Sequence, residues 1–574
     1  MASAPVVRRE TVAGSAPDGG ETSRRIAFRR GGDAPGLRGL PLAVAVVAGL
    51  VAFGSMLWMY FRRLGINPPG FFCDEAEIGF RTWQLLHGKL PAPSLRFPFF
   101  YQHIDYTIGA FPLYFGAPFI ALFGVSDVAV RASATVAMVI GLLALVGLAH
   151  RLGLRNGWLG VVVFALSPIA IHMARFNMAH AHGFMMTALG MFLYVLARDR
   201  RSARIAAVSG VVLGLSVYAN PAWYIAAPVT VGCIGLGELV ANRAVLSRWR
   251  PFAWMVAGVV LSWIPLFHRM ATDPHFFDRF KEKEGSGAAS LLSITRWQEM
   301  LAEYPKYYSF DFLFREASEG GNLRHAVPGA GLFPLLVLPL LVLGVMAVIG
   351  ERRSTAKVIG VWSIAMLVLM PIVDIPTTSP EAAPYTFAMF PMLIGVPVLC
   401  GFGISLVSRW IGGALASSWR QAVVPVALSV LVLVGAWSFY QGPYAEYGKT
   451  AGGYYGWQFG PGEAIAAFEA DNFQHDHYFL DSDFNAAYVF LDFYLADNPE
   501  LAARTSLGAP HERPISGSML YAVRPDRWER YVGPHDPQRR YAKLVDVIYY
   551  PDGTPALLVL SISLQNVPTP VDNW

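Results

Sequence analysis

The sequence predicts a mainly α-helical, polytopic membrane protein of about eleven spans, followed by a small extracytoplasmic domain of α/β type. Of its 574 residues, 54% are apolar, and the mean hydropathy is +0.41. Only 15% are charged, whereas soluble domains have about 25%. The apolar residues also gather in runs near the ~20 residues that a helix needs to cross a bilayer.

The N-terminal part predicts a cytosolic tail and an uncleaved first span. Residues 1–39 are rich in Arg, Gly, Ala and Ser and lack an apolar core, which is typical of disorder. Their arginines favour an N-terminus inside. The run 40–61 that follows is longer than the core of a signal peptide, so we expect it to remain as a span.

Ten further spans are expected along the chain. They are 128–150, 157–173, 180–197, 204–220, 222–240, 251–267, 330–349, 357–374, 385–407 and 421–440. The basic residues fall in every second connection, at Arg151 and Arg155, Arg198 to Arg204, Arg243 to Arg250, Arg352 to Lys357, and Arg409 with Arg420. This pattern predicts short cytosolic loops, and an odd number of spans leaves the C-terminal tail outside. We therefore expect a multi-pass protein of the cytoplasmic (inner) membrane.

Two long outer segments and the tail interrupt this pattern. Segment 62–127 ends in an apolar stretch broken by Pro112 and Pro118, for which we expect helices along the membrane surface. Segment 268–329 is too polar to span. From residue 441 to 574, charges return, and the sequence predicts a helix in AIAAFEADNF, a strand in HYFLDSD, a helix in AAYVFLDFYLA and a hairpin around Pro551-Asp552-Gly553. The predicted domains are thus 1–39, 40–440 and 441–574.

Three carboxylates, Asp74, Glu75 and Glu77, lie in the loop directly after the first span. Carboxylates so close to a membrane are costly unless they face water or have a function. Asp74 with Glu77 fits a variant of the capping box, with a helix following to about Leu86. Asp74 also fits a general base that acts beside a membrane-embedded substrate. The residues alone leave both interpretations open.

The other polar candidates are all predicted on the outer side. Besides the three carboxylates they are His103, Asp105, Arg131, Arg175, Asn177, His180, Asn220, Tyr224, Arg324, His325 and Tyr385. Simpler roles exist for several: an arginine can snorkel to the interface, and a tyrosine can belong to the interfacial aromatic belt. The three cysteines are far apart, and no full set of metal ligands is evident, so neither a disulfide nor an obligatory divalent metal is predicted.

Several of these stretches resemble one known family. After the Asp74-Glu75 pair, PLYFGAPFIALFGVSDVAVRASA leads into the second span, and YSFDFLFREASEGGNLRHAVPGAGLF follows in the second long loop. In this order the sequence resembles the bacterial family 39 glycosyltransferases, relatives of the protein O-mannosyltransferases and of the lipid A aminoarabinose transferase. The resemblance covers roughly residues 40–440 and implies the GT-C membrane fold.

The resemblance also implies an activity. It is inverting transfer of a hexose or pentose from a polyprenyl-phosphate-linked donor to a glycan, lipid or protein acceptor at the outer membrane face. The expected catalytic residues are then Asp74, as the base, and Glu75 beside it. For the donor phosphate we expect Arg131, Arg175, Arg324 and His325, chosen for their charge and side of the membrane. The expected substrate-binding residues are Glu77, His103, Asp105, Asn177, His180, Asn220, Tyr224 and Tyr385.

The sequence departs from the family in one turn and leaves two other functions open. Many relatives have an acidic residue between the third and fourth spans, where this chain has Arg175, Asn177 and His180. A transporter or flippase of lipid-linked sugars would use similar polar groups, and a non-catalytic assembly factor would not need Asp74. Charges at loop ends and the lack of a repeat favour the enzyme over a transporter. Membrane lipids are expected partners, and nucleic acid is not.

Overall fold

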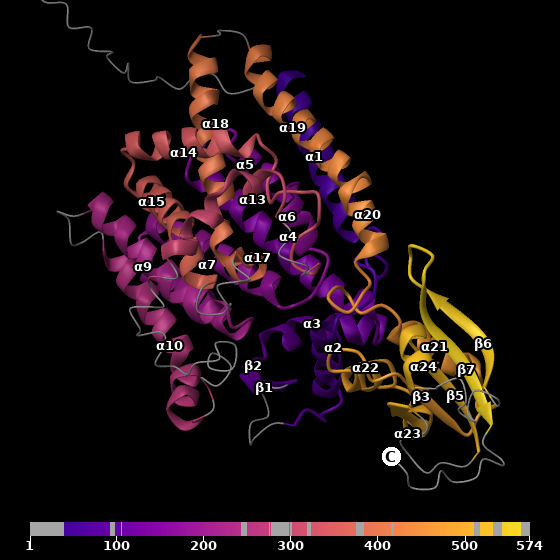
Figure 1. Ribbon diagram of the computed structural model, residues 1–574. Helices are drawn as coiled ribbons and strands as arrows, with labels where there is room; N and C mark the ends of the chain where they lie inside the picture. Colours follow the sequence, from indigo (N-terminus) through magenta and orange to yellow (C-terminus); the bar gives the residue numbers. More distant parts are fainter. Residues whose placement is uncertain are drawn as a thin grey trace, which may run out of the picture.

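The computed structural model describes residues 40–91, 98–104, 106–242, 249–274, 276, 298, 301–317, 323–374, 384–414, 418–509, 517–531 and 542–563. The predicted tail 1–39 lies outside these residues. Up to residue 450, the described residues form helices almost throughout (Figure 1). The long helices are α1 (Leu40–Phe61), α4 (Asp127–Arg151), α7 (His180–Arg200), α9 (Trp223–Asn242), α10 (Arg250–Thr272), α18 (Gly395–Ala414) and α19 (Ser418–Gln441).

The other predicted spans correspond to shorter or interrupted helices. These are α5 (Trp158–Ala165) with α6 (Pro168–Met173), α8 (Ala203–Gly214) with η1 (Leu215–Tyr218), α14 (Val337–Gly350), α15 (Ser354–Val368) with α16 (Met370–Asp374), and α17 (Thr386–Met389) with η6 (Phe390–Ile394) ahead of α18. Proline accounts for two of the breaks, because Pro168 and Pro391 each open a new helical segment. Among the described residues, seven helices are long and apolar enough to cross a membrane. The count of eleven spans therefore stays a prediction.

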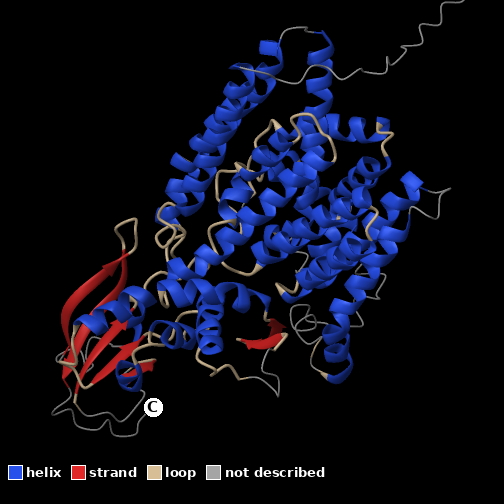
Figure 2. Ribbon diagram, turned by 180° about the vertical axis from the view of Figure 1, so that it is seen from behind, coloured by secondary structure: helices blue, strands red, loops and turns tan. Residues whose placement is uncertain are grey.

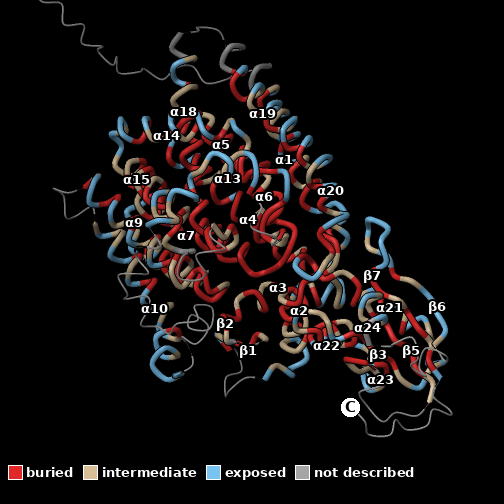
Figure 3. Tube along the Cα trace, viewed as in Figure 1, coloured by how far each residue is buried: buried red, intermediate tan, exposed pale blue. Residues whose placement is uncertain are grey.

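The helices form one bundle. Helices α1 and α19 run side by side along one flank (Figure 1), while α4, α7, α8 and α10 pack in succession. Helices α14, α15, α18 and α9 complete the bundle, and its interior is continuously buried (Figure 3). Two predicted cytosolic loops meet at one end, because Arg353 donates a hydrogen bond to the carbonyl of Leu152 at 2.7 Å. These two loops therefore lie at the same end of the bundle, as expected for two loops on one side of the membrane.

A second layer covers the opposite end of the bundle. It contains α2 (Cys73–Leu86), a hairpin of β1 (Phe100–His103) and β2 (Tyr106–Gly109), and α3 (Phe111–Phe123). Helix α3 falls in the stretch for which we expect surface helices, and it ends in the exposed side chains of Leu122 and Phe123. The hairpin was not predicted. Short elements η4 (Tyr304–Tyr308), α13 (Phe310–Phe314) and α20 (Pro443–Thr450) also belong to the helical part.

The C-terminal domain lies beyond this layer and has the predicted α/β type (Figure 2). Its sheet has the strand order β4-β3-β5-β7-β6, with β3 parallel to β4 and β5 and the remaining pairs antiparallel. The elements are α21 (Pro461–Ala470), β3 (His477–Leu480), α22 (Tyr488–Tyr494), α23 (Pro499–Arg504), β4 (Thr505–Leu507), β5 (Ser518–Val523), α24 (Pro525–Tyr531), β6 (Ala542–Tyr549) and β7 (Pro555–Ser563). The two predicted helices, the strand and the hairpin are all present. Helix α22 packs against α2, so this domain directly contacts the helix that carries Asp74, Glu75 and Glu77.

Candidate functional site

Helix α2 begins at Cys73, two residues earlier than a cap at Asp74 requires. Its N-cap is Phe72, in extended backbone, and the Glu75 carboxylate accepts the Phe72 N–H at 3.4 Å. The prediction that Asp74 caps the helix with Glu77 is therefore wrong, because Glu75 occupies the third helical position and bonds back to the cap. Asp74 is the second residue of the helix, where the helix dipole still favours a negative charge.

Glu75 is the buried anchor of this loop. Its side chain is fully buried and pairs in two places with Arg131, from Nε to Oε1 at 3.0 Å and from Nη2 to Oε2 at 2.9 Å. Oε1 also accepts the backbone N–H of Asn177 at 2.9 Å. The Asn177 amide donates to the Val130 carbonyl at 3.0 Å. Glu75 thus joins α2, α4 and the turn before α7 in one hydrogen-bonded unit.

The two buried arginines have their hydrogen-bond donors occupied. Arg131 donates to Glu75 and to the carbonyls of Leu64, Pro68 and Gly70. Arg175 donates to carbonyls of Met59, Tyr60, Arg62, Arg63 and Asn67 and to the Tyr444 hydroxyl. A guanidinium has five N–H groups, and this many protein acceptors leaves none for a phosphate. The geometry therefore argues against the phosphate-binding role predicted for Arg131 and Arg175, and favours a role in holding the loop before α2.

Asp74 faces the other way and is partly exposed. Its side chain retains 29% exposure, and its Oδ1 lies 3.4 Å from Nε2 of His103, which is buried in β1. The Cys73 thiol lies 3.9 Å from the same oxygen. Burial raises the pKa of Cys73 and the charge of Asp74 adds to this rise, so the thiol stays protonated. The unpredicted hairpin thus brings one of the expected residues, His103, to Asp74.

Arg324 and His325 approach the same turn of α2 from the second long loop. The Arg324 guanidinium lies 4.1 Å from the ring centroid of Phe72, the N-cap residue. Its charge acts on Cys73 and lowers the thiol pKa against the effect of burial. The Tyr385 hydroxyl and His325 Nε2 are 3.1 Å apart. Arg324 therefore places a positive charge at the first turn of α2, and His325, the next residue, is paired with Tyr385.

The other predicted site residues have local roles. Glu77 is buried and paired with Arg81 at 2.7 Å. His180 bonds the Met173 carbonyl at 2.7 Å and packs against Phe387 and Phe390. The Asn220 amide donates to the Met178 carbonyl and accepts the Ala222 N–H, which fixes a turn, and the ring of Tyr224 packs against Phe276. Asp105 lies outside the described residues.

Sequence reasoning missed the residues through which the C-terminal domain holds α2. The Trp83 indole donates to Asp497 at 2.8 Å, and Phe71 stacks on Phe493 with ring centroids 5.0 Å apart. Trp457 faces the Arg131 guanidinium at 5.6 Å. The stretch AAYVFLDFYLA gave a signal for this contact, because it has more aromatic residues than one helix face can bury against its own small domain. Across the described ranges, no group of three or more His, Cys, Asp or Glu side chains could hold a metal ion.

Known structures share this fold. The chain is similar to ArnT from Cupriavidus metallidurans bound to undecaprenyl phosphate, with a TM-score of 0.53 and 11% identity over 91% of this chain and all of that one. The apo state of that protein gives a TM-score of 0.53, 12% identity and coverage of 91% and 99%. An oligosaccharyltransferase from Archaeoglobus fulgidus is less similar, with a TM-score of 0.45, 12% identity and coverage of 90% and 72%. No protein-family model and no curated protein matches the chain. The predicted GT-C fold is confirmed.

Proposed function

We propose that this protein is a membrane glycosyltransferase that moves a sugar from a polyprenyl-phosphate-linked donor to an acceptor at the outer face of the cytoplasmic membrane. Asp74 is the general base, and the reaction inverts the anomeric carbon. The acceptor is a glycan, a lipid or a protein. The fold supports this proposal, since the ArnT structure with the same fold contains undecaprenyl phosphate, a polyprenyl phosphate.

One observation supports the assignment of Asp74 above all others: the two adjacent carboxylates differ completely in environment. Glu75 is fully buried and bonded to Arg131 and Asn177, whereas Asp74 is partly exposed beside His103. A general base must reach its substrate and start ionised. Asp74 meets both needs, because it is accessible and lies in the first turn of α2, where the helix dipole stabilises its charge.

The same surroundings fit the chemistry of the step. The acceptor oxygen attacks the anomeric carbon, its proton passes to Asp74, and the carbon–oxygen bond to the lipid phosphate breaks. The lipid phosphate leaves with the electron pair and therefore needs positive charge more than it needs an acid. Arg324, which lies over the ring of Phe72 at the start of the helix that carries Asp74, supplies such a charge, and His325 beside it in the sequence is paired with Tyr385. No step of this scheme requires Arg131 or Arg175.

The test compares Asp74→Asn with the wild type in purified, detergent-solubilised protein. The amide keeps the size of the carboxylate but cannot take the proton, so we expect turnover of a polyprenyl-phosphate sugar to fall about 10²–10⁴-fold. The melting temperature should stay unchanged, because Asp74 is neither buried nor the cap. A polyprenyl-phosphate pentose and hexose are both assayed, with a nucleotide sugar as the control donor.

Two results would contradict the proposal. Full activity in Asp74→Asn protein would remove Asp74 as the base. Turnover of the nucleotide sugar without any lipid carrier would remove the donor class. Movement of an intact lipid-linked sugar across the membrane of reconstituted vesicles, without transfer of the sugar to an acceptor, would instead support a transporter.

A further inference from the structure

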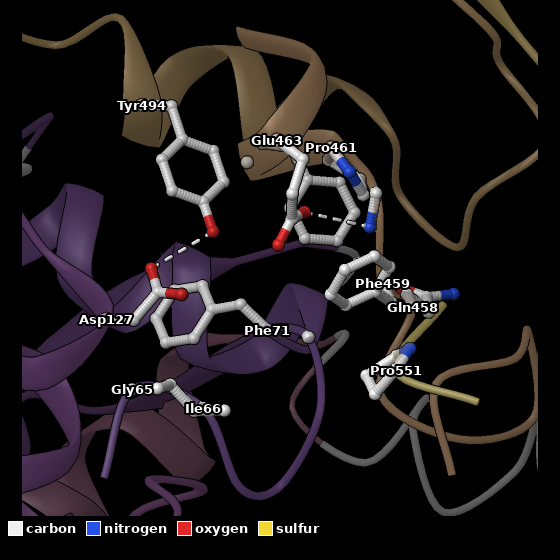
Figure 4. A pocket seen from close by; sticks show the side chains of 14 residues that line it. Gly65, Ile66, Phe71, Asp127, Gln458, Phe459, Pro461, Glu463, Tyr494 and Pro551 are labelled. Carbon is white, nitrogen blue, oxygen red and sulfur yellow. Dashed lines mark hydrogen bonds between the residues drawn. The ribbon is translucent and has the colours of Figure 1, made fainter. Parts of the chain in front are cut away.

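The cavity where the C-terminal domain meets the helical domain is a contact between the two. It has a volume of about 100 Å³, and its walls include the segment before α2, the first residue of α4 and residues 458–463. The Tyr494 hydroxyl donates to Asp127 at 3.0 Å, and Glu463 accepts the Gly460 N–H at 3.1 Å (Figure 4). Both carboxylates thus have protein partners. A different polar cluster lies on the sheet of the C-terminal domain.

This cluster is a row of three side chains: an aspartate, a histidine and a serine. Asp471 directly follows α21, His475 lies in the loop that leads to β3, and Ser561 belongs to β7, an inner strand of the sheet. Asp471 Oδ1 lies 2.8 Å from His475 Nδ1, and His475 Nε2 lies 2.8 Å from Ser561 Oγ. A carboxylate on one ring nitrogen and a hydroxyl on the other is the arrangement that activates a serine as a nucleophile.

The hydrogen bonds to Asp471 determine which nitrogen of the ring carries the proton. The carboxylate also accepts the Tyr478 hydroxyl at 2.7 Å and the His475 backbone N–H at 3.0 Å. Burial raises the pKa of Asp471, but the hydrogen bonds from Tyr478 and His475 outweigh burial and hold this pKa below its ordinary value. Because an ionised carboxylate only accepts hydrogen bonds, Nδ1 of the ring is the donor to it. In the neutral imidazole, Nε2 then accepts the Ser561 O–H.

The loop between Asp471 and His475 has a backbone that its residues do not favour. Asn472 and Phe473 have φ angles of 48° and 61°, in the left-handed region, which is an outlier for a residue as bulky as phenylalanine. The Arg504 guanidinium packs over the Phe473 ring, 4.7 Å from its centroid. Such strained residues persist only where the surrounding structure holds them, and they cluster at functional sites. Here the strained loop returns the histidine to the aspartate four residues before it.

Solvent reaches the groups that would react. The side chains of His475 and Asp471 retain 15% and 11% exposure, and Ser561 is half-buried. Lys543 on β6 is the direct antiparallel partner of Ser561, so the two side chains lie on the same face of the sheet with Cβ atoms about 5 Å apart. Lys543 is exposed, and its ammonium group is therefore within reach of an oxyanion that develops beside the serine.

We propose that Ser561, His475 and Asp471 form a second active site, which cleaves carboxylic esters of small acyl groups. Ser561 Oγ bonds to the carbonyl carbon of the ester while its proton passes to His475 Nε2. The bond from this carbon to the alcohol oxygen then breaks, and the leaving alcohol takes the proton. Water attacks the acyl-serine with the same histidine as base, which releases a carboxylic acid and restores the serine. Asp471 is a positioning residue, because it acts through the histidine.

The surroundings of the serine select the substrate class. The narrow access to His475 and Asp471 favours a small acyl group. An ester fits better than an amide, because an alcohol leaves more readily than an amine and a single lysine offers the oxyanion only one charge. This site is separate from the transfer proposed at Asp74, and its test does not depend on that activity.

The experiment uses the full-length protein in detergent and two probes: a fluorophosphonate, which bonds covalently to activated serines, and p-nitrophenyl acetate, an ester of a small acyl group. Mass spectrometry should locate the phosphonate on Ser561, and Ser561→Ala should lose both the label and the ester turnover. His475→Gln removes the base and should slow both reactions about 10²–10⁴-fold. Asp471→Asn permits the wrong tautomer of the ring, so it should lower the turnover number by up to about 10⁴-fold while the KM changes little.

Ser563→Ala is the matched control, because Ser563 is an exposed serine two residues further along β7. It should react with both probes as the wild type does. Wild-type protein without phosphonate on Ser561 would overturn the proposal. So would labelling of Ser561 that is equally fast in His475→Gln protein with the wild-type melting temperature. A third comparison needs no variant: heat-denatured wild-type protein should not be labelled, and equal labelling of native and denatured protein would show that the fold does not activate the serine, which would also refute the site.

Discussion

Glu75→Gln should damage the fold rather than the chemistry, although Glu75 is the neighbour of the proposed base. The substitution leaves the Arg131 guanidinium buried without its counter-charge. The new amide NH₂ is also a donor, and it faces one of the N–H donors of the arginine. Both side chains are fully buried, and Arg131 makes two hydrogen bonds to Glu75, at 3.0 and 2.9 Å. Breaking a buried pair on one side typically costs about 3–5 kcal/mol. We expect the lower end, about 3 kcal/mol, because glutamine still offers one oxygen.

Thermal unfolding in detergent, followed by the loss of monodisperse protein, measures this effect. A loss of about 3 kcal/mol corresponds to roughly 6 °C at ~2 °C per kcal/mol, the value for larger domains. The double variant Glu75→Gln with Arg131→Met should recover part of the loss, since it removes the uncompensated charge. Asp74→Asn is the matched control, one residue away, and should melt like the wild type. A Glu75→Gln protein with wild-type melting would refute the reasoning that Glu75 is the anchor.

Three further predictions concern other contacts. His103 Nε2 lies 3.4 Å from Asp74 Oδ1, so we expect it to hold this carboxylate in place. His103→Ala should therefore lower the turnover number while the KM changes little, and His103→Gln, which keeps a donor nearby, should restore most of the rate; equal losses in both variants would contradict this. Asp497→Asn weakens the bond from Trp83, by about 1 kcal/mol, and should speed protease cleavage between the two domains, whereas an unchanged digest would argue against the contact. The pKa of Glu463 is raised by burial, so the folded state holds a proton that the unfolded state releases above about pH 4.3. The stability of the protein should therefore fall as pH rises above that value, and Glu463→Gln should flatten this dependence of the melting temperature.

The helices and the C-terminal elements could be predicted because they depend on local patterns. Apolar runs of membrane length gave the long helices, and Pro551-Asp552-Gly553 between two apolar strands gave the hairpin of β6 and β7. Hairpin β1–β2 escaped prediction because its strands have only four residues each. A segment this short has too few alternations to indicate a strand.

The different roles of the adjacent carboxylates Asp74 and Glu75 could not be predicted. Consecutive residues on a helix point about 100° apart, so Asp74 and Glu75 point in different directions, but the sequence does not say which of them faces inward. The choice is made by Arg131, 56 residues further along the chain. Arg175 shows the same limit. Its charge and position fitted a phosphate ligand, but all its partners except the Tyr444 hydroxyl are backbone carbonyls, which a pattern of side chains does not reveal.

Gly70, four residues before Asp74, bears on how the protein is made. Its φ is +95°, and an added Cβ would lie 2.7 Å from the Phe459 nitrogen and the Trp457 oxygen, so the two backbones are in direct contact. The ribosome reaches residue 457 almost 400 residues after it has made this loop. Until then the segment that begins α2 lacks one of its walls, and the Gly70 carbonyl that Arg131 binds has no fixed position. A nascent chain halted before the C-terminal domain would thus expose an unfinished loop, and membrane quality control would encounter a polypeptide in which the start of α2 still lacks its packing partner.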